Sequence, residues 1–241
     1  DQFTMTTFVL VHGAWGGSWQ WGGVARLLRV AGHDVFTPSL TGCGERAHLM
    51  GPDINLETHI QDVIGLMDYE MLDDIALVGH SYAGMVITAI ADRMPERLRA
   101  LIYIDAALPK DGEAMLDIVS AERKQTVIGL AEEHGEGIWV PQTLVLETGI
   151  EDDGERENFL NRMCPHPLAA LMQPLSLTGN LKKVPRKAYV FAARNNSHRF
   201  LEYRDWAAEQ ADWTAETMDT WHFPMVTQTQ QTADLLNRLV T

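Results

Sequence analysis

Residues 75–94, IALVGHSYAGMVITAIADRM, decide the fold of this 241-residue chain. The stretch opens with four apolar residues, Ile75 to Val78, which is typical of a strand buried on both faces. A turn of small residues follows, Gly79 to Gly84, and a helical pattern then runs from Ala83 to Met94 and ends before Pro95. A strand, a tight turn and a helix in direct succession indicate the first half of a parallel crossover unit.

Short apolar runs and longer helical patterns alternate in the same way on both sides of this stretch. Further strands are predicted at 7–11, 34–37, 101–104, 188–191 and 214–218, and further helices at 24–30, 56–67, 200–211 and 232–240. Strands that are apolar throughout and alternate with helices belong to a largely parallel sheet, and right-handed crossovers place helices on both faces. The predicted fold class is therefore α/β, with a doubly wound, mostly parallel sheet.

The segment 108–181 interrupts this alternation. It contains helical pieces, glycines and a turn-rich stretch around Pro165, but no clean strand. A connection of this length between two strands is far longer than usual, and such insertions often cover a site. We therefore expect a core of residues 5–107 and 182–241 with an inserted helical lid at 108–181. An independent second domain is the alternative, but the segment has no linker at either end. Residues 1–4 are interpreted as a cloning remnant ahead of a natural Met5.

Composition excludes several classes of protein. The chain is 46% hydrophobic and 22% charged, which is ordinary globular usage and excludes wholesale disorder. It has no apolar run of about 18 residues and no basic-then-apolar leader, so we expect neither a membrane partner nor a signal peptide. A net charge of −14 is the wrong sign for nucleic acid. Two cysteines, Cys43 and Cys164, suit a reducing compartment, and the expected location is cytoplasmic. A homodimer remains open.

Ser81 is the first candidate for chemistry, because it lies on the turn between the predicted strand and helix of the opening stretch. A serine on such a turn exposes its hydroxyl above the sheet, beside helix amides that favour developing negative charge. In the pattern G-x-S-x-G the last position is glycine, whereas here it is Ala83, followed by Gly84. Alanine is small enough to keep the packing. The alternative is that Ser81 only caps the helix.

A serine nucleophile needs a base, and the chain has nine histidines. His222 differs from the others because it follows the last predicted strand and precedes the final helix. In a doubly wound sheet this loop opens at the carboxyl edge, the same edge as Ser81. The order of nucleophile followed by terminal histidine is the one that hydrolases of this topology use. We therefore predict that His222 is the base.

An oxyanion would need two N–H donors. The backbone amide of Tyr82 is one candidate, and the amide of Ala14, in the glycine-rich loop after the first strand, is the other. Spacing for a dinucleotide fingerprint is absent, as are a Walker motif, H-E-x-x-H and paired C-x-x-C motifs. No cofactor and no metal are expected.

At this point the sequence resembles a known family. FVLVHGAWGGSWQW at 8–21, the turn 79–84, the stretch 102–112 and the His222 loop are similar to the α/β-hydrolase superfamily, and within it to the small branch of plant methylesterases, hydroxynitrile lyases and bacterial relatives. The resemblance implies an α/β-hydrolase fold with Ser81 as nucleophile, His222 as base, and Ala14 and Tyr82 as oxyanion donors.

The acid of the expected triad is where the chain departs from that family. The family usually places an acid just after the strand at 188–191, where this chain has Asn195. An asparagine can accept a hydrogen bond from imidazole but carries no charge to stabilise an imidazolium. Asp105 ends the neighbouring strand and is the predicted acid, as in some superfamily members. A dyad assisted by Asn195 is the catalytic alternative. A purely structural role for Asp105, as a turn cap or as the ion-pair partner of a basic residue, is the other.

The resemblance leaves several reactions open. The lyases carry a threonine after the first-strand histidine and a lysine after the catalytic histidine, whereas this chain has Gly13 and Phe223. Hydrolysis of a small to medium carboxylic ester through an acyl-enzyme on Ser81 is therefore the predicted function. A cofactor-independent dioxygenase, a hydroxynitrile lyase-type enzyme and a receptor-like ligand-binding protein with low turnover are the alternatives.

Substrate contacts are predicted for Gly13, Trp15, Trp139 and Phe223. Further candidates for an apolar pocket under the lid are Trp19, Met115, Phe159, Met163 and Met172. The segment 108–181 holds 13 acidic and five basic side chains, so it carries more than half of the chain's net charge of −14. We expect this field to disfavour anionic substrates and to favour neutral or cationic esters.

Overall fold

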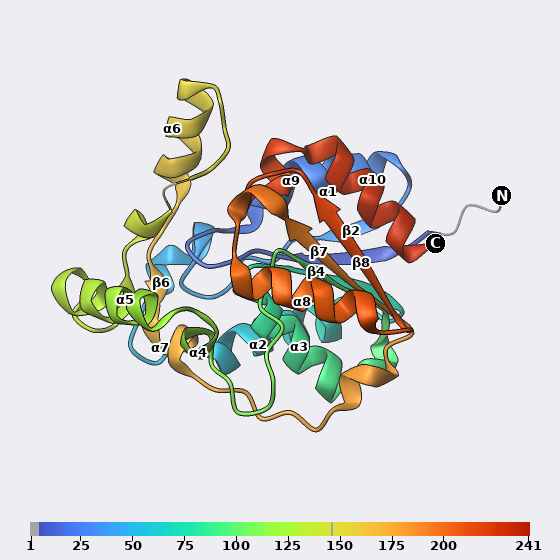
Figure 1. Ribbon diagram of the computed structural model, residues 1–241, viewed down its shortest axis with the longest axis horizontal. Helices are drawn as coiled ribbons and strands as arrows, with labels where there is room; N and C mark the ends of the chain where they lie inside the picture. Colours follow the sequence, from blue (N-terminus) through green and yellow to red (C-terminus); the bar gives the residue numbers. More distant parts are fainter. Residues whose placement is uncertain (1–4, 146) are drawn as a thin grey trace.

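The computed structural model describes residues 5–145 and 147–241, so the interpretation of residues 1–4 lies outside it. At its centre is a parallel sheet of six strands in the order β2-β1-β3-β4-β7-β8 (Figure 1). Its strands are β1 (Thr7–Val11), β2 (Asp34–Phe36), β3 (Ile75–His80), β4 (Leu98–Ile104), β7 (Arg186–Ala192) and β8 (Trp213–Met218). The strand order reverses between β1 and β3, and the loops after these two strands leave the sheet on either side of that point. A crevice at such a switch point is where open α/β sheets bind ligands.

Helices cover both faces of the sheet. One face carries α1 (Gly22–Val30), α9 (Pro224–Thr227) and α10 (Thr229–Val240), and the other carries α2 (Leu56–Tyr69), α3 (Ala83–Arg93) and α8 (His198–Glu209), as Figure 1 shows. Short 3-10 turns complete this part: η1 (Ser18–Trp21), η2 (Gly44–Leu49), η3 (Pro95–Arg97), η5 (Asn180–Lys183) and η6 (Ala193–Asn195). The doubly wound arrangement predicted from the sequence is confirmed.

Strand periodicity divides the core into two halves. In β1, Val9 and Val11 belong to the cluster under α2, α3 and α8, whereas Phe8 and Leu10 belong to the cluster under α1 and α10. Successive side chains of a strand point to opposite faces, so each apolar strand supplies both layers. The absence of a polar face on the central strands therefore follows from burial on both sides.

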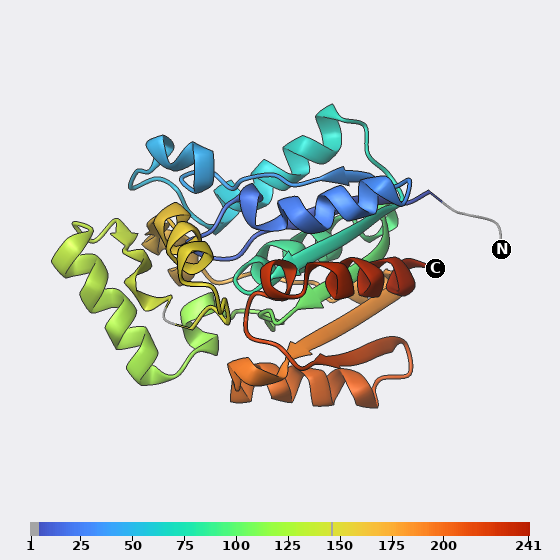
Figure 2. The ribbon, with the colours of Figure 1, turned by 90° about the horizontal axis from the view of Figure 1, so that it is seen from above.

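The segment 108–181 has its residues 115–145 and 147–172 beyond the carboxyl ends of the strands, at the end of the molecule opposite the C-terminus (Figure 2). Its last residues return to the end of α3, where the Thr178 and Asn180 amides donate to Asp92 at 2.7 Å and 2.8 Å. The segment is therefore not confined to that end of the molecule. It contains α4 (Met115–Ile118), α5 (Ala121–His134), β5 (Trp139–Val140), η4 (Gln142–Leu144), α6 (Asp153–Arg162), β6 (His166–Pro167) and α7 (Leu168–Met172). Strands β5 and β6 pair antiparallel, with Val140 opposite His166. This pair was not predicted from the sequence, because strands of two residues have no measurable periodicity.

Among the described residues, no helix is long and apolar enough to span a bilayer. Cys43 and Cys164 are both buried and unbridged. The Cys164 thiol approaches the Gly16 carbonyl at 3.4 Å and the Gly44 amide at 3.3 Å, so it joins the inserted segment to two loops of the sheet domain.

Candidate active site

Ser81 lies on a strained turn between β3 and α3. Its φ of 54° is in the left-handed region, which costs a non-glycine residue free energy and is retained chiefly where the site requires it. The turn is held because the Ser81 carbonyl accepts from the amides of Gly84, at 3.1 Å, and Ala107, at 3.0 Å. A Cβ on Gly84 would come within 1.8 Å of the Ala107 carbonyl oxygen. The close approach of the Ala107 carbonyl to the start of α3 therefore requires glycine at position 84.

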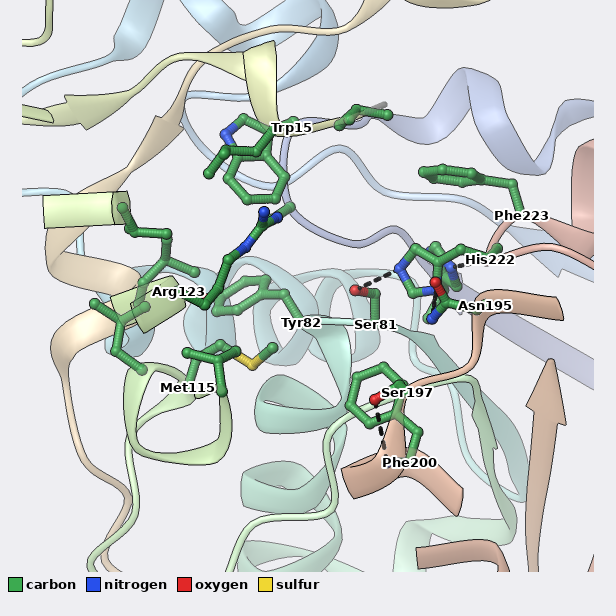
Figure 3. A pocket seen from close by; sticks show the side chains of 18 of the residues that line it. Trp15, Ser81, Tyr82, Met115, Arg123, Asn195, Ser197, Phe200, His222 and Phe223 are labelled. Atoms are coloured by element: carbon green, nitrogen blue, oxygen red, sulfur yellow. Dashed lines mark hydrogen bonds between the residues drawn. The ribbon is translucent and has the colours of Figure 1, made fainter. Parts of the chain in front are cut away.

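Three predicted residues meet at the carboxyl edge of the sheet. The Ser81 hydroxyl oxygen lies 3.0 Å from Nε2 of His222, which is on the loop after β8. On the other side of the ring, His222 Nδ1 lies 2.6 Å from Oδ2 of Asp105, which directly follows β4. Figure 3 shows the Ser81 hydroxyl facing the imidazole. Such a series of contacts can move the hydroxyl proton onto the imidazole while a carboxylate orients the ring.

Asp105 is fully buried, and its carboxylate accepts several hydrogen bonds. Its Oδ1 accepts from the amide of Ala192 at 3.0 Å, and its Oδ2 accepts from Nδ2 of Asn195 at 2.8 Å, in addition to the contact with His222. The amide nitrogen of Asn195 also lies 3.3 Å from His222 Nδ1. Because Nδ1 must be protonated to donate to Asp105, that contact joins two donors and is not a productive hydrogen bond. Asn195 thus contacts Asp105, the predicted acid, and does not accept a hydrogen bond from His222.

His80 holds the backbone of the loop after β8, which contains His222. Its Nε2 donates to the His222 carbonyl oxygen at 2.6 Å, and the two imidazole rings lie 4.5 Å apart. Complete burial lowers the pKa of His80 well below its ordinary value, so this ring stays neutral beside His222. In the sequence His80 is part of the turn motif, but its contact with His222 was not predictable there, because it depends on the distance between β3 and the loop after β8.

The predicted oxyanion donors lie on the loops after β1 and β3. Among the described residues, neither the Ala14 nor the Tyr82 amide has an acceptor, which leaves both N–H groups available to a ligand. His12 braces the first loop, because its Nδ1 donates to the Gly13 carbonyl at 2.8 Å and its Nε2 accepts from the Leu40 amide at 3.0 Å. Burial lowers the pKa of His12 to about 4, so it is neutral at physiological pH.

Two further histidines, His59 and His166, contact the loops after β1 and β3. His59 Nδ1 accepts from the Tyr82 hydroxyl at 2.8 Å, and its Nε2 donates to the Thr41 carbonyl at 2.8 Å. His166, from β6, accepts from the Trp15 amide at 3.4 Å and packs against the Tyr82 ring with centroids 4.7 Å apart. Burial lowers the pKa of His59 to about 4 and that of His166 well below its ordinary value. Neither residue carried a signal in the sequence, since both are distant along the chain from the residues they hold.

A cavity of about 420 Å³ opens above Ser81. Its apolar wall includes Trp15, Tyr82, Met115, Leu116, Val119, Val127, Leu144, Val145, Leu171, Phe200 and Phe223. Its polar lining includes Ser81, His222, Asn195, Ser197, Arg123 and Glu147. The wall comes mainly from the segment 108–181, so a ligand beside Ser81 would also contact that segment.

Two of the four predicted substrate contacts line this cavity, Trp15 and Phe223. Gly13 instead lies against Ser81, since a Cβ there would be 2.9 Å from the Ser81 Cβ. Trp139 belongs to β5 and is not part of the lining. Of the further candidates, Met115 lines the cavity; Trp19, Phe159, Met163 and Met172 do not. Trp19 and Phe159 pack against each other instead, with ring centroids 5.2 Å apart.

A parallel sheet wound on both faces, with a serine on a strained turn after β3, defines an α/β-hydrolase. A profile described as the alpha/beta hydrolase family matches residues 8–235, and the chain belongs to this family. It is 37% identical to a carbendazim hydrolyzing esterase from Nocardioides sp. (strain SG-4G), over 98% of this chain and 100% of that protein. It is 28% identical to a putative chloroplastic methylesterase, methylesterase 14 of Arabidopsis thaliana, over 79% of this chain and 59% of that protein.

Solved structures agree on the fold. An extracellular alpha/beta-hydrolase from a Paenibacillus species superposes with a TM-score of 0.84 at 24% identity, over 97% of this chain and 98% of that one. Since family and relatives point to the same class, the chain is a carboxylic ester hydrolase.

Proposed function

We propose that the protein hydrolyses small to medium carboxylic esters through an acyl-enzyme on Ser81. The observation that carries this proposal is the continuous contact from the Ser81 hydroxyl through the His222 ring to Asp105, with distances of 3.0 Å and 2.6 Å. A hydroxyl becomes a competent nucleophile when a neighbouring base accepts its proton.

In this mechanism His222 Nε2 takes the proton as the Ser81 oxygen attacks the ester carbonyl carbon. The tetrahedral oxyanion accepts hydrogen bonds from the Ala14 and Tyr82 amides, which are stronger for the developing charge than for the neutral carbonyl. His222 then returns the proton to the alcohol oxygen as the ester bond breaks. Water attacks the acyl-enzyme by the same route, with His222 as base, and releases the acid and free Ser81.

The substrate class follows from the cavity and the relatives. A volume of about 420 Å³ with a mostly apolar wall suits an acyl group of modest size. The methylesterase and carbendazim esterase relatives suggest a small leaving alcohol, with methanol as the first choice. The segment 108–181 would act as a lid that supplies most of the acyl contacts and excludes water from Ser81.

The test combines turnover with covalent labelling. The parent protein should hydrolyse p-nitrophenyl acetate and react with a phosphonofluoridate-type serine reagent at Ser81, located by peptide mass spectrometry. Ser81→Ala should lose both the ester hydrolysis and the labelling, because the substitution removes the hydroxyl that would attack the ester and the reagent. Undiminished ester hydrolysis by Ser81→Ala would reject the assignment. Oxygen consumption with a quinolone-type substrate, or release of cyanide from a cyanohydrin, would instead support the dioxygenase or lyase alternatives.

A further inference from the structure

Arg123 is a charged residue in the wall of the cavity that the proposed hydrolysis does not use. It lies in the first turns of α5, and Figure 3 shows its side chain directed into the cavity, between Trp15 and Tyr82 in this view. The residue is partly buried, and this burial lowers the pKa of the guanidinium from its ordinary value. An arginine nevertheless stays protonated at physiological pH. The cavity therefore holds a fixed positive charge on the side of the inserted segment.

The Arg123 guanidinium has no counter-charge among the described residues. It forms neither an ion pair nor a hydrogen bond, and burial is the sole influence on its pKa. The next residue, Lys124, pairs outside the cavity with Asp117 at 3.0 Å. Glu147, the other charged residue of the lining, is exposed and does not pair with Arg123. A partly desolvated guanidinium without an acceptor is costly, and a carboxylate satisfies its planar donors in a bidentate manner.

We propose that Arg123 binds a carboxylate on the acid portion of the substrate, so that the preferred substrates are monoesters of dicarboxylic acids. This inference rests on the proposed ester hydrolysis and adds the substrate class. The scissile ester would lie at Ser81 with its alcohol portion small, and the acyl chain would span the apolar wall toward α5. Because the acyl chain crosses an apolar surface between two polar ends, its length should determine the rate.

The acidic surface of the segment 108–181 repels an anionic ester, whereas Arg123 attracts its carboxylate. The relative strength of these two interactions determines whether such an ester is a good substrate. Exposed charges act at a distance and are screened beyond about 8 Å at physiological ionic strength. A direct, partly desolvated guanidinium–carboxylate contact is screened far less, and it changes affinity by about tenfold to a hundredfold. We therefore expect the surface field to slow the arrival of an anionic ester at low salt, while Arg123 makes it the better substrate once bound.

The experiment compares monomethyl esters of straight-chain dicarboxylic acids of increasing length with the matching methyl esters that end in a primary amide. In the parent at physiological salt, kcat/KM for the best carboxylate ester should exceed that of its amide partner by about tenfold or more. Arg123→Met should remove this advantage, mainly by raising KM for the carboxylate ester, so that the two matched esters are hydrolysed with similar kcat/KM. Arg123→Lys should keep part of the advantage, because it keeps the charge but not the planar fork.

Lys124→Met is the matched control, since it removes the same charge from the adjacent position, which does not line the cavity. It should leave the carboxylate-to-amide ratio unchanged. Binding of the free dicarboxylic acid, measured by calorimetry on the parent and on Arg123→Met, gives a readout independent of turnover, and only the parent should bind. Equal ratios or equal binding in the parent and Arg123→Met would overturn the assignment of Arg123. Failure of the parent to hydrolyse any ester, p-nitrophenyl acetate included, would instead reject the proposed function.

Discussion

The amide of Asn195 and the carboxylate of Asp105 are joined by a hydrogen bond of 2.8 Å, and it ends on the same oxygen that approaches His222 Nδ1. The residue at the position where the resemblance would place an acid therefore contacts a carboxylate that follows the neighbouring strand. Both residues lie at the carboxyl edge, one after β4 and one after β7, and these strands are adjacent in the sheet. Adjacent parallel strands end side by side, so either one can present a group to the same imidazole.

This relationship predicts unequal effects of substitution. Asp105→Asn should lower kcat by about 10⁴-fold with little change in KM, because an amide cannot balance the imidazolium and favours the wrong tautomer. Asn195→Ala should lower kcat by only about tenfold, since it removes a group that orients the acid. Steady-state kinetics with p-nitrophenyl acetate measures both. A large loss in Asn195→Ala together with a small loss in Asp105→Asn would show that Asp105 is not the acid.

Gly13→Ala tests how closely the loop after β1 packs against Ser81. Its new Cβ would lie 2.9 Å from the Ser81 Cβ and 3.1 Å from the His80 carbonyl oxygen, so either the loop or the serine must move. We expect kcat to fall by about 10²-fold, because small displacements of reacting groups are costly. The melting temperature should be followed in parallel. Unchanged kcat in a folded Gly13→Ala variant would show that the loop can relax without disturbing Ser81.

Gly84→Ala should destabilise the fold. The added Cβ would lie 1.8 Å from the Ala107 carbonyl oxygen, which is backbone and cannot rotate away. We expect the free energy of unfolding to fall by about 3 kcal/mol or more, as measured by urea denaturation. Gly65→Ala is the matched control, because this residue lies inside α2 with nothing within 4 Å of the added Cβ. The control should gain up to about 1 kcal/mol through helix propensity. Equal effects of the two substitutions would contradict this packing argument.

Buried neutral histidines should make the protein sensitive to acid. Burial lowers the pKa of His12 and of His59 from 6.5 to about 4 in the folded state. Between these values the unfolded chain binds more protons than the folded chain. Stability is therefore fully present above about pH 6.5 and is lost as the pH falls toward 4. The slope from these two residues should approach 1.4 kcal/mol per pH unit for each, or roughly 3 kcal/mol per unit together.

Urea denaturation at several pH values between 4 and 7 measures this slope. His12→Gln should be less stable at neutral pH, because it disturbs the contacts with Gly13 and Leu40, but its stability should depend less steeply on pH. His48→Gln, at an exposed position, should leave the slope unchanged. A slope in His12→Gln equal to that of the parent would mean that His12 does not resist protonation in the folded protein.

Local sequence patterns sufficed to predict the sheet and the turn that carries Ser81. The apolar run of β3, the small residues of the turn and the pattern of α3 are contiguous, so their geometry depends on neighbours in the chain. His222 was also predictable, because the topology of a parallel sheet places the loop after its last strand at the edge where Ser81 lies.

Other features depend on distances that no local pattern encodes. Trp139 resembled a substrate contact in sequence but lies in the short β5–β6 pair, and His166, from the same pair, supports Trp15 instead. Arg123 was one charge within an acidic segment until the structure placed it in the cavity wall.

The sequence by itself therefore determined the fold class, the serine turn and the histidine loop, because each follows from hydrophobic periodicity and from residues close together in the chain. Only the tertiary structure decided that Asp105 contacts His222, that Asn195 contacts Asp105, and that the Arg123 guanidinium faces the cavity. These contacts join strands and helices far apart in sequence, and their distances are set by how the whole core packs.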